Sequence, residues 1–188
     1  MNILLHQCCG PCSIYPVEVL RSLGHSIAGY WFNPNIHPLT EYYRRFETLV
    51  KFNRDEKIPF FADDNYGLVE FTHNVANAHN SRCAYCYAVR LEAAAKRASD
   101  EGFDAFTSTL FYSRYQNHEL MKETAQNISV KYSIGFFYYD FRTGWQKGID
   151  CSKEKDMYRQ PYCGCIYSEE DRYRAQISKK INNLLSDN

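Results

Sequence analysis

The sequence predicts an α/β protein, a single domain over residues 1–188 with a mostly parallel sheet flanked by helices. Short apolar segments alternate with segments of helical periodicity along most of the chain. Alternation of this kind favours parallel strand pairing with helices on both faces of the sheet. The 188 residues are enough to bury one core, and no repeat or low-complexity linker divides them.

Five apolar segments are predicted to form the strands. Each is short and bounded by turn residues or by a helical segment, as is typical of buried parallel strands. They cover residues 3–5, 26–32, 58–62, 103–109 and 136–141.

Six further segments are predicted to be helices. Ser13 is a good N-cap for the first, and Gly24 is a suitable residue to end it. In the second, Arg44, Arg45 and Lys51 are expected to point outward. The opposite, apolar face of that helix comprises Leu39, Tyr42, Tyr43, Phe46, Leu49 and Val50. The helices are expected over residues 13–23, 39–54, 65–78, 82–101, 118–132 and 169–185.

Residues 142–165 are expected to be irregular or partly helical, so the fold has an irregular, cysteine-rich segment toward its C-terminus. The whole arrangement is Rossmann-like or HUP-like. In such sheets ligands bind beyond the carboxyl ends of the strands. Cys8 follows the first strand at such an end, in a loop that nucleotide-binding proteins fill with glycine or serine. Thiols in that loop predict a chemistry other than the binding of a nucleotide's phosphates.

Charge and hydropathy limit the possible partners and compartment. The 22 lysines and arginines balance 22 acidic residues, so nucleic-acid binding would need a local basic face. The N-terminus lacks the basic and long apolar regions of a signal peptide, and no segment approaches the length of a membrane span. We therefore expect a cytoplasmic protein without membrane contact, whose thiols stay reduced.

Seven of the eight cysteines fall into three clusters. Four thiolates complete one tetrahedral ion or one iron–sulfur cluster, so seven indicate a metal centre and something further nearby. Soft thiolates select zinc, copper(I) or iron–sulfur, and these mixed spacings fit iron–sulfur better than paired zinc knuckles. The clusters are Cys8, Cys9 and Cys12; Cys83 and Cys86; and Cys163 and Cys165.

The spacing within each cluster leaves alternatives open. Cys83 and Cys86 share one face at a helix start, which favours metal ligation over a thioredoxin-like redox pair. Gly164 allows its two neighbouring cysteines to meet one centre or two, with a structural zinc loop as the alternative. Cys8 and Cys9 are expected to point apart, toward two neighbouring centres or as one ligand and one reactive thiol.

Two cysteines have simpler explanations. Cys12, which follows Gly10-Pro11, either turns back to the site or is a small buried core residue. Cys151 stands alone and is interpreted as an incidental thiol.

Several polar residues are candidates for catalysis or substrate binding. Asp140, at the end of the last strand, is either a metal ligand or proton donor, or a helix cap paired with Arg142. His6 and His37 are candidate proton donors, although a histidine on a strand is usually a packed core group. Tyr158, Arg159 and Tyr162 form a basic and aromatic patch beside the last cysteine cluster, which suits a nucleotide.

Taken together, these segments resemble the cobalamin-independent epoxyqueuosine reductases. The resemblance rests on five blocks that run in order from residue 6 to residue 168, and Cys151 lies outside them. The blocks are HQCCGPCS from His6, NPNIHP from Asn33 with Glu41-Tyr42, CAYCY from Cys83 with Arg90-Leu91, DFR from Asp140, and MYRQPYCGCIYS from Met157.

The resemblance implies an oxidoreductase that deoxygenates epoxyqueuosine in tRNA to queuosine, the last step of queuosine biosynthesis. It implies a [4Fe–4S] cluster and an additional mononuclear iron, held by the seven clustered cysteines, with Asp140 as the candidate ligand that is not a cysteine. The tRNA would present its anticodon loop, and Arg142 would join the basic and aromatic patch. A ferredoxin or flavodoxin is the expected electron donor. The terminal helix, with Arg172, Arg174, Lys179 and Lys180, is either a phosphate contact, a partner-binding helix or a solvated charged face.

Three other functions remain possible on the sequence. An iron–sulfur tRNA sulfur transferase would need a serine- and glycine-rich ATP loop after the first strand, which this chain lacks. A zinc-stabilised RNA-binding module would hold zinc without iron. A thiol–disulfide redox protein would have a titratable disulfide and no metal absorbance.

Overall fold

The computed structural model describes residues 1–76 and 82–186, and its strands form a five-stranded sheet in the order β3-β2-β1-β4-β5. Every neighbouring pair is parallel. The strands are β1 (Asn2–His6), β2 (Ser26–Trp31), β3 (Phe60–Ala62), β4 (Ala105–Ser108) and β5 (Gly135–Phe136). The predicted α/β class and its five strands are confirmed.

Strand β1 lies at the centre of the sheet, between β2 and β4. Its residues Ile3, Leu4 and Leu5 are fully buried, because helices cover both faces. The chain winds outward from β1 to β3 and then returns to β4 on the other side. The switch in winding direction therefore falls between the carboxyl ends of β1 and β4, where ligand sites of such sheets form.

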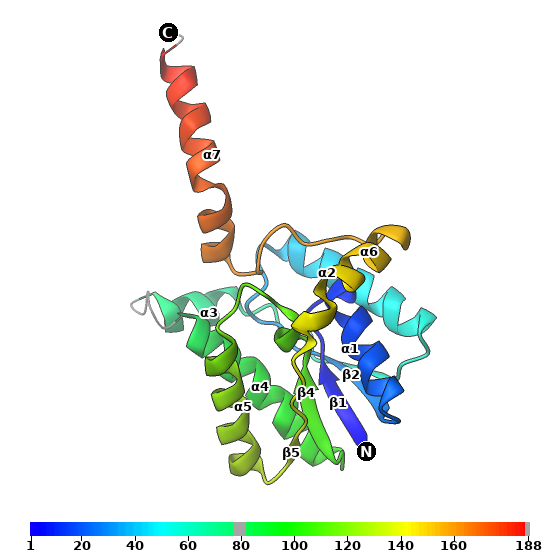
Figure 1. The fold of residues 1–188 in the computed structure, drawn as a ribbon. Coiled ribbons are helices and arrows are strands. Elements are labelled where there is room, and N and C mark those ends of the chain that lie inside the picture. Colours follow the sequence, from blue (N-terminus) through cyan, green and yellow to red (C-terminus); the bar gives the residue numbers. More distant parts are fainter. Residues whose placement is uncertain (77–81, 187–188) are drawn as a thin grey trace.

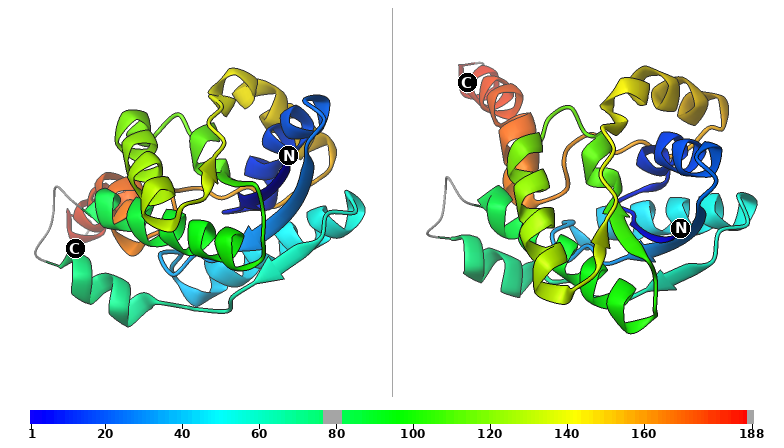
Figure 2. Two further views of the ribbon diagram at one scale, coloured as in Figure 1. Left: turned by 90° about the horizontal axis from the view of Figure 1, so that it is seen from below. Right: turned by 60° about the horizontal axis from the view of Figure 1, so that its bottom comes forward.

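The helices form two layers around the sheet (Figure 2). On one face α1 (Gly10–Ser22) packs against α2 (Leu39–Asp55) and α6 (Trp145–Glu154). On the other, α4 (Arg82–Asp100) packs against α5 (His118–Tyr132), and the short α3 (Leu68–Val75) contacts α4. Two 3-10 helices, η1 (Thr109–Tyr112) and η2 (Phe141–Gly144), follow β4 and β5.

The last helix, α7 (Ile166–Ser186), projects away from the rest of the molecule (Figure 1). None of its residues is buried. No helix among residues 1–76 and 82–186 is both long and apolar enough to cross a membrane.

Helix α1 begins at Gly10, so the prediction that Ser13 caps it is wrong. The cap is Cys9, whose Sγ accepts the backbone N–H of Cys12 at 3.4 Å. Ser13 lies inside the helix and donates to the Cys9 carbonyl at 2.8 Å. A cysteine therefore takes the place of the usual hydroxyl cap. The predicted end at Gly24 is confirmed, with a φ of +77°.

In α2, the prediction that Arg45 points outward is wrong. Its side chain is 1% exposed, whereas Arg44 and Lys51 are exposed as predicted. The segment that leads to Cys163 crosses α2 and covers Arg45, a long-range contact that helical periodicity does not encode. Only half of the residues predicted for the apolar face of α2 are buried or half-buried. Its buried or half-buried members are Tyr42, Phe46 and Leu49, and its exposed members are Leu39, Tyr43 and Val50.

Other boundaries differ more modestly from the predictions. The helix predicted over residues 65–78 is α3, which is shorter, and residues 77–78 of that range lie outside the described part. The last strand is β5, only two residues long, and the aromatic residues after it lead into η2. Part of the segment 142–165 is helical as expected, since it contains α6.

Candidate metal centre

The thiols of Cys8, Cys9 and Cys12 meet at the carboxyl end of β1. Their three Sγ atoms all lie within 4.8 Å of one another, and those of Cys8 and Cys9 are 3.9 Å apart. A tetrahedral ion with metal–sulfur bonds of about 2.3 Å separates two thiolates by about 3.8 Å. The spacing of Cys8 and Cys9 therefore fits a single ion.

The prediction that the side chains of Cys8 and Cys9 point apart is wrong. That prediction assumed an extended chain, in which neighbouring side chains alternate. Instead the chain bends at Cys8, and Cys9 is the extended N-cap of α1. The bend turns both thiols to the same side.

The three thiols differ in acidity because they hydrogen-bond to one another. Hydrogen bonds from Cys12 and Cys9 hold the pKa of the Cys8 thiol well below its usual value. Burial raises the pKa of Cys9, and the hydrogen bond to Cys8 raises that of Cys12. A metal bound by this group would hold the coordinating thiols in their deprotonated form.

Thr109 joins this group to β4 across the switch point. Its Oγ1 accepts the backbone N–H of Cys8 at 3.1 Å and donates to the Cys8 Sγ at 3.3 Å. From the other side, the Gln160 Nε2 donates to the Cys12 Sγ at 3.1 Å. Hydrogen bonds to sulfur orient thiolates and favour their charged form.

Cys83, Cys86, Cys163 and Cys165 form the second group. Cys86 and Cys165 are buried and pack together with Phe71 and Val75. Burial raises the pKa of Cys86 to about 12 and also raises that of Cys163, and the charge of Cys165 acts in the same direction on both. Among the residues that the structure describes, these four do not meet the single-ion spacing of the first group. An iron–sulfur cluster needs wider spacing, because it places several irons between its thiolates.

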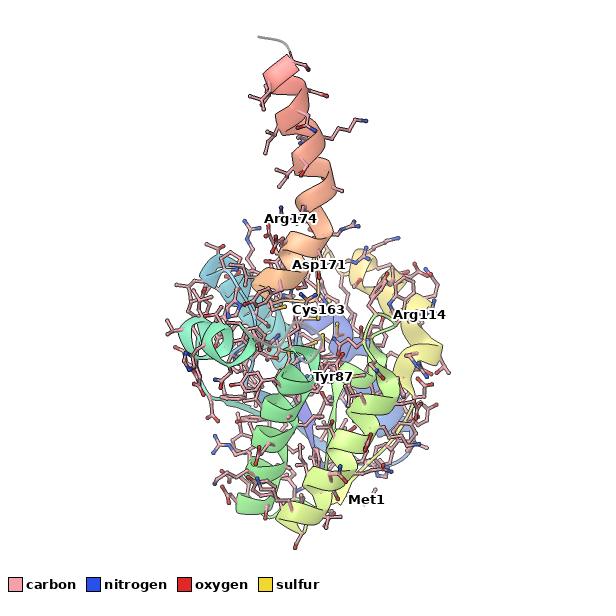
Figure 3. The ribbon with its side chains drawn as sticks, turned by 90° about the vertical axis from the view of Figure 1, so that its left-hand side faces the viewer. Met1, Tyr87, Arg114, Cys163, Asp171 and Arg174 are labelled. Carbon is pink, nitrogen blue, oxygen red and sulfur yellow. The ribbon has the colours of Figure 1, made fainter. Side chains whose placement is uncertain are left out.

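Three helix N-termini carry these cysteines. Cys9 caps α1, while Cys83 and Cys86 lie at the start of α4. Cys165 directly precedes α7, and its Sγ accepts the backbone N–H of Ser168 at 3.4 Å. Figure 3 shows Cys163 at the foot of α7, with further sulfur atoms around it. The positive end of each helix favours the thiolate form.

A buried ion pair on α2 anchors the last cysteine loop. Arg45 bonds Glu41 at 2.7 Å and donates to the carbonyl oxygens of Tyr162 and Cys163 at 3.0 and 2.9 Å. The hydroxyl of Tyr158 donates to the other oxygen of Glu41. The pair thus fixes the segment between Tyr158 and Cys163 against α2, a role that the sequence did not indicate.

Two buried polar features fit an anionic metal group at this place. The guanidinium of Arg90 donates to the Cys86 Sγ at 3.0 Å. The side chain of Asn35 is 1% exposed, and neither its Nδ2 nor its Oδ1 has a hydrogen-bond partner among the described residues. It lies beside Gly164, since a Cβ added to that glycine would be 3.4 Å from the Asn35 Nδ2. Seven soft donors beside such groups suit a thiolate-bound metal.

Both candidate histidines are buried. The ring of His6 bonds the Ser108 Oγ at 2.8 Å and the Phe32 carbonyl at 3.1 Å, and burial lowers its pKa to about 4. His6 is therefore a neutral, hydrogen-bonded core group. His37 bonds the Pro34 carbonyl through Nε2, and its Nδ1 has no hydrogen-bond partner among the described residues. Its backbone N–H donates to the Gly164 carbonyl at 2.8 Å, which ties its loop to the last cysteine cluster.

Asp140 caps η2 and pairs with Arg142. The Asp140 Oδ1 accepts the Arg142 backbone N–H at 3.1 Å, and the Arg142 guanidinium bonds both carboxylate oxygens at 2.8 and 2.6 Å. These hydrogen bonds hold the pKa of Asp140 below its usual value. As folded here, Asp140 is a carboxylate and Arg142 is its partner.

A cavity of about 700 Å³ opens beside the thiols. Cys8, Cys12 and Cys163 face it from the metal side, and Arg159 and Tyr162 of the predicted patch also line it. Tyr158, Asp140 and Arg142 are not among its lining residues. The sequence did not indicate the aromatic residues of the lining, Tyr112, Tyr115 and Trp145. Aromatic residues before α5 and at the start of α6 were the only signal that could have pointed to it.

The fold and the site together define a class of protein: a parallel α/β protein with a thiol-lined site, suited to a metal, at the switch point of its sheet. The family model described as "Epoxyqueuosine reductase QueH" matches residues 3–171. The chain belongs to this family of oxidoreductases.

Relatives named Epoxyqueuosine reductase QueH match nearly the whole chain. The protein from Dehalococcoides mccartyi is 33% identical, over 92% of this chain and 94% of its own. The protein from Thermotoga maritima is 31% identical, over 97% of this chain and 99% of its own.

A solved structure shares the fold. It is titled as a predicted subunit of tRNA methyltransferase from Methanocaldococcus jannaschii, with a TM-score of 0.57 and 13% identity. The match covers 82% of this chain and 75% of the other. At this level of identity the match indicates a common fold, which agrees with the predicted HUP-like arrangement.

Proposed function

We propose that this protein reduces epoxyqueuosine in tRNA to queuosine, the last step of queuosine biosynthesis. The observation that carries the proposal is the meeting of the Cys8, Cys9 and Cys12 thiols at the switch point of a sheet whose chain belongs to this family. Removal of the epoxide oxygen as water leaves an alkene and consumes two electrons and two protons. A tRNA substrate also favours a cytoplasmic location.

The thiol groups support a division between two metals. Cys8, Cys9 and Cys12 have the compact spacing of ligands to one iron. The more widely spaced Cys83, Cys86, Cys163 and Cys165 would hold a [4Fe–4S] cluster. When bound, such a cluster supplies single electrons, and the separate iron supplies Lewis acidity toward oxygen. An external donor of the ferredoxin or flavodoxin type would deliver the electrons one at a time.

Residues of the chain itself would position the substrate, bind the metal and supply a proton. The cavity would receive the modified base with its epoxide beside Cys8 and Cys12. Asp140 is a carboxylate in this structure, which suits a ligand better than a proton donor. Of the two histidines only His37 keeps a nitrogen, Nδ1, without a hydrogen-bond partner among the described residues. Because Nε2 bonds the Pro34 carbonyl and burial lowers the pKa of His37, this nitrogen would have to take up a proton before it could donate one.

The rim of the cavity supports recognition of single-stranded RNA. Arg159 and Arg172 line it, and neither forms an ion pair among residues 1–76 and 82–186. The ring of Tyr115 is 85% exposed at the rim. Beside it, Arg114 lies 4.5 Å from the ring centre of Trp145. Exposed aromatic rings stack on unpaired bases and arginines contact phosphates, so this rim is the local basic face that a neutral protein needs.

Analysis of iron, sulfide and zinc in protein purified without oxygen tests the proposal. We expect about four or five irons and four sulfides per chain, with a broad absorption near 400 nm. This protein should convert epoxyqueuosine in tRNA when a chemical reductant is supplied. One zinc without iron would refute the proposal in favour of a zinc-stabilised RNA-binding module.

Replacement of Asp140 separates a role as metal ligand from one as helix cap. If Asp140 acts at the metal, Asp140→Ala should lower turnover by about 100-fold or more while the sulfide content stays unchanged. Arg142→Gln is the matched control, because it breaks the same ion pair but spares the carboxylate. Equal losses in the two variants would show that the pair has only a structural role.

Variants of the rim should weaken tRNA binding without affecting the metal. Tyr115→Ala should raise the Kd for the anticodon stem-loop about 5- to 150-fold, the equivalent of about 1–3 kcal/mol of stacking. Replacing both Arg159 and Arg172 with glutamine should reduce the salt dependence of binding by about 0.7 per lost phosphate contact. Tyr43→Ala, which removes an exposed tyrosine of α2, is the control. Unchanged Kd in the rim variants would place the RNA elsewhere.

A further inference from the structure

Arg90 is a buried arginine whose contacts are to a thiol. On α4 it is 2% exposed, and its Nε donates to the Cys86 carbonyl at 2.9 Å. Its Nη2 donates to the Cys86 Sγ at 3.0 Å. Within the described residues no carboxylate forms an ion pair with it. Burial of an unpaired charge costs several kcal/mol, so the fold requires an anion at this place.

Arg45 is also a buried arginine, but its partners differ from those of Arg90. Arg45 is equally buried, at 1% exposure, but it pairs with Glu41 at 2.7 Å. Its guanidinium otherwise bonds backbone carbonyls. Arg90 lacks such a carboxylate partner, and the acceptor in its place is a cysteine sulfur. The anion for Arg90 is therefore a thiolate or a group that thiolates hold.

Both thiol groups act on Arg90. The charges that influence its guanidinium come first from Cys86, then from Cys163 and Cys8. Arg90 also helps to lower the pKa of His6, which precedes the first cysteine cluster, after the larger effect of burial. Arg45 also feels the charges of Cys9 and Cys8, so the hydrogen bond to the Cys86 sulfur is what distinguishes Arg90.

We infer that Arg90 is the counter-charge of the thiol group that contains Cys86, and that its hydrogen bond to Cys86 raises the reduction potential of the iron–sulfur cluster. Each reduction by an external one-electron donor adds one negative charge to the cluster and needs no proton. A fixed guanidinium offsets that charge, and a hydrogen bond to a ligand sulfur acts in the same direction. Arg90 is a positioning residue in this scheme. The inference rests on the proposed cluster and does not depend on tRNA.

A redox titration of the cluster, followed by electron paramagnetic resonance without tRNA, tests the inference. Arg90→Gln should shift the reduction potential to more negative values, because it removes the charge. Arg90→Lys keeps the charge but loses the planar fork, so its shift should be smaller in the same direction. The control is Arg97→Gln, on the same helix, whose arginine pairs with Asp63 and Glu101 at 3.1 and 3.2 Å. Unchanged potentials in both Arg90 variants would overturn the inference.

A measurement on the unmodified holoprotein covers the case in which the variants do not fold. In protein labelled with ¹⁵N-arginine, the reduced cluster should show a ¹⁵N coupling from the guanidinium that donates to Cys86. Absence of this coupling would overturn the inference even if tRNA is reduced normally. A loaded cluster with the coupling but no tRNA reduction would instead refute the proposed function alone, and protein without an iron–sulfur cluster would refute both.

Discussion

Replacement of Cys86 by serine should abolish the iron–sulfur cluster and with it the reduction of tRNA. Cys86 is buried in an apolar cluster with Cys165, and serine there offers a hard oxygen in place of a soft sulfur. We expect loss of nearly all sulfide and of the visible absorption. Turnover should fall well beyond the roughly 10- to 100-fold typical of residues that only support a metal ligand. Metal analysis and single-turnover assays on the same preparation measure both effects.

Serine variants of two further cysteines test which cysteines bind the iron–sulfur cluster and which bind the separate iron. Cys12→Ser should remove about one iron and leave about four irons with their sulfide, because Cys12 lies in the compact group. Cys151→Ser is the control and should keep all the metal, since Cys151 lies on α6 and is not a member of the compact group. Loss of sulfide from Cys12→Ser would show that the first group holds the cluster and would overturn the proposed division.

Replacement of Arg45 by methionine should have the largest effect on stability. The change leaves Glu41 buried without its partner and removes the donors to two carbonyl oxygens of the last cysteine loop. Loss of one partner of a buried pair costs about 3–5 kcal/mol in the free energy of unfolding. We also expect faster loss of iron, because the Cys163 loop loses its anchor. Urea denaturation of the apoprotein and iron release from the holoprotein measure the two effects.

Two comparisons assign these losses to the ion pair. Arg54→Gln removes an exposed arginine near the end of the same helix and should change stability by less than about 0.5 kcal/mol. In a Glu41→Gln background, Arg45→Met should cost less than in the wild type, because no unpaired carboxylate remains. An equal cost in both backgrounds would show that Arg45 stabilises the protein through packing rather than charge.

Local patterns were enough to predict the fold class. The apolar segments with residues 3–5 and 26–32 become β1 and β2, and the alternation with helices predicted parallel pairing. Boundaries were less accurate where long-range contacts decide them. The aromatic segment at 136–141 has strand propensity, yet only Gly135–Phe136 pairs with a neighbour, opposite Ala105 and Phe106, although β4 continues to Ser108.

The site was predicted in its composition but not in its arrangement. The seven clustered cysteines follow from their spacing, and the cavity beside Arg159 and Tyr162 agrees with the expected patch. The buried ion pair of Arg45 was missed, because helical periodicity places it beside Arg44 on the solvent side. Arg90 was noticed only as part of a motif. Its contact with the Cys86 thiol is a local one, four residues apart on α4, which helical periodicity could have indicated.

By itself, the sequence determined the α/β class, the membership of the reductase family and the residues that supply soft ligands. These follow from residue types and short spacings, which a chain carries before it folds. The tertiary structure decided that Arg45 of α2 is a buried charge tied to the Cys163 loop, that Arg90 is buried without a carboxylate partner among the described residues, and that Thr109 holds Cys8. These features depend on segments far apart in the chain, whose contacts form only when the sheet brings the ends of its strands together.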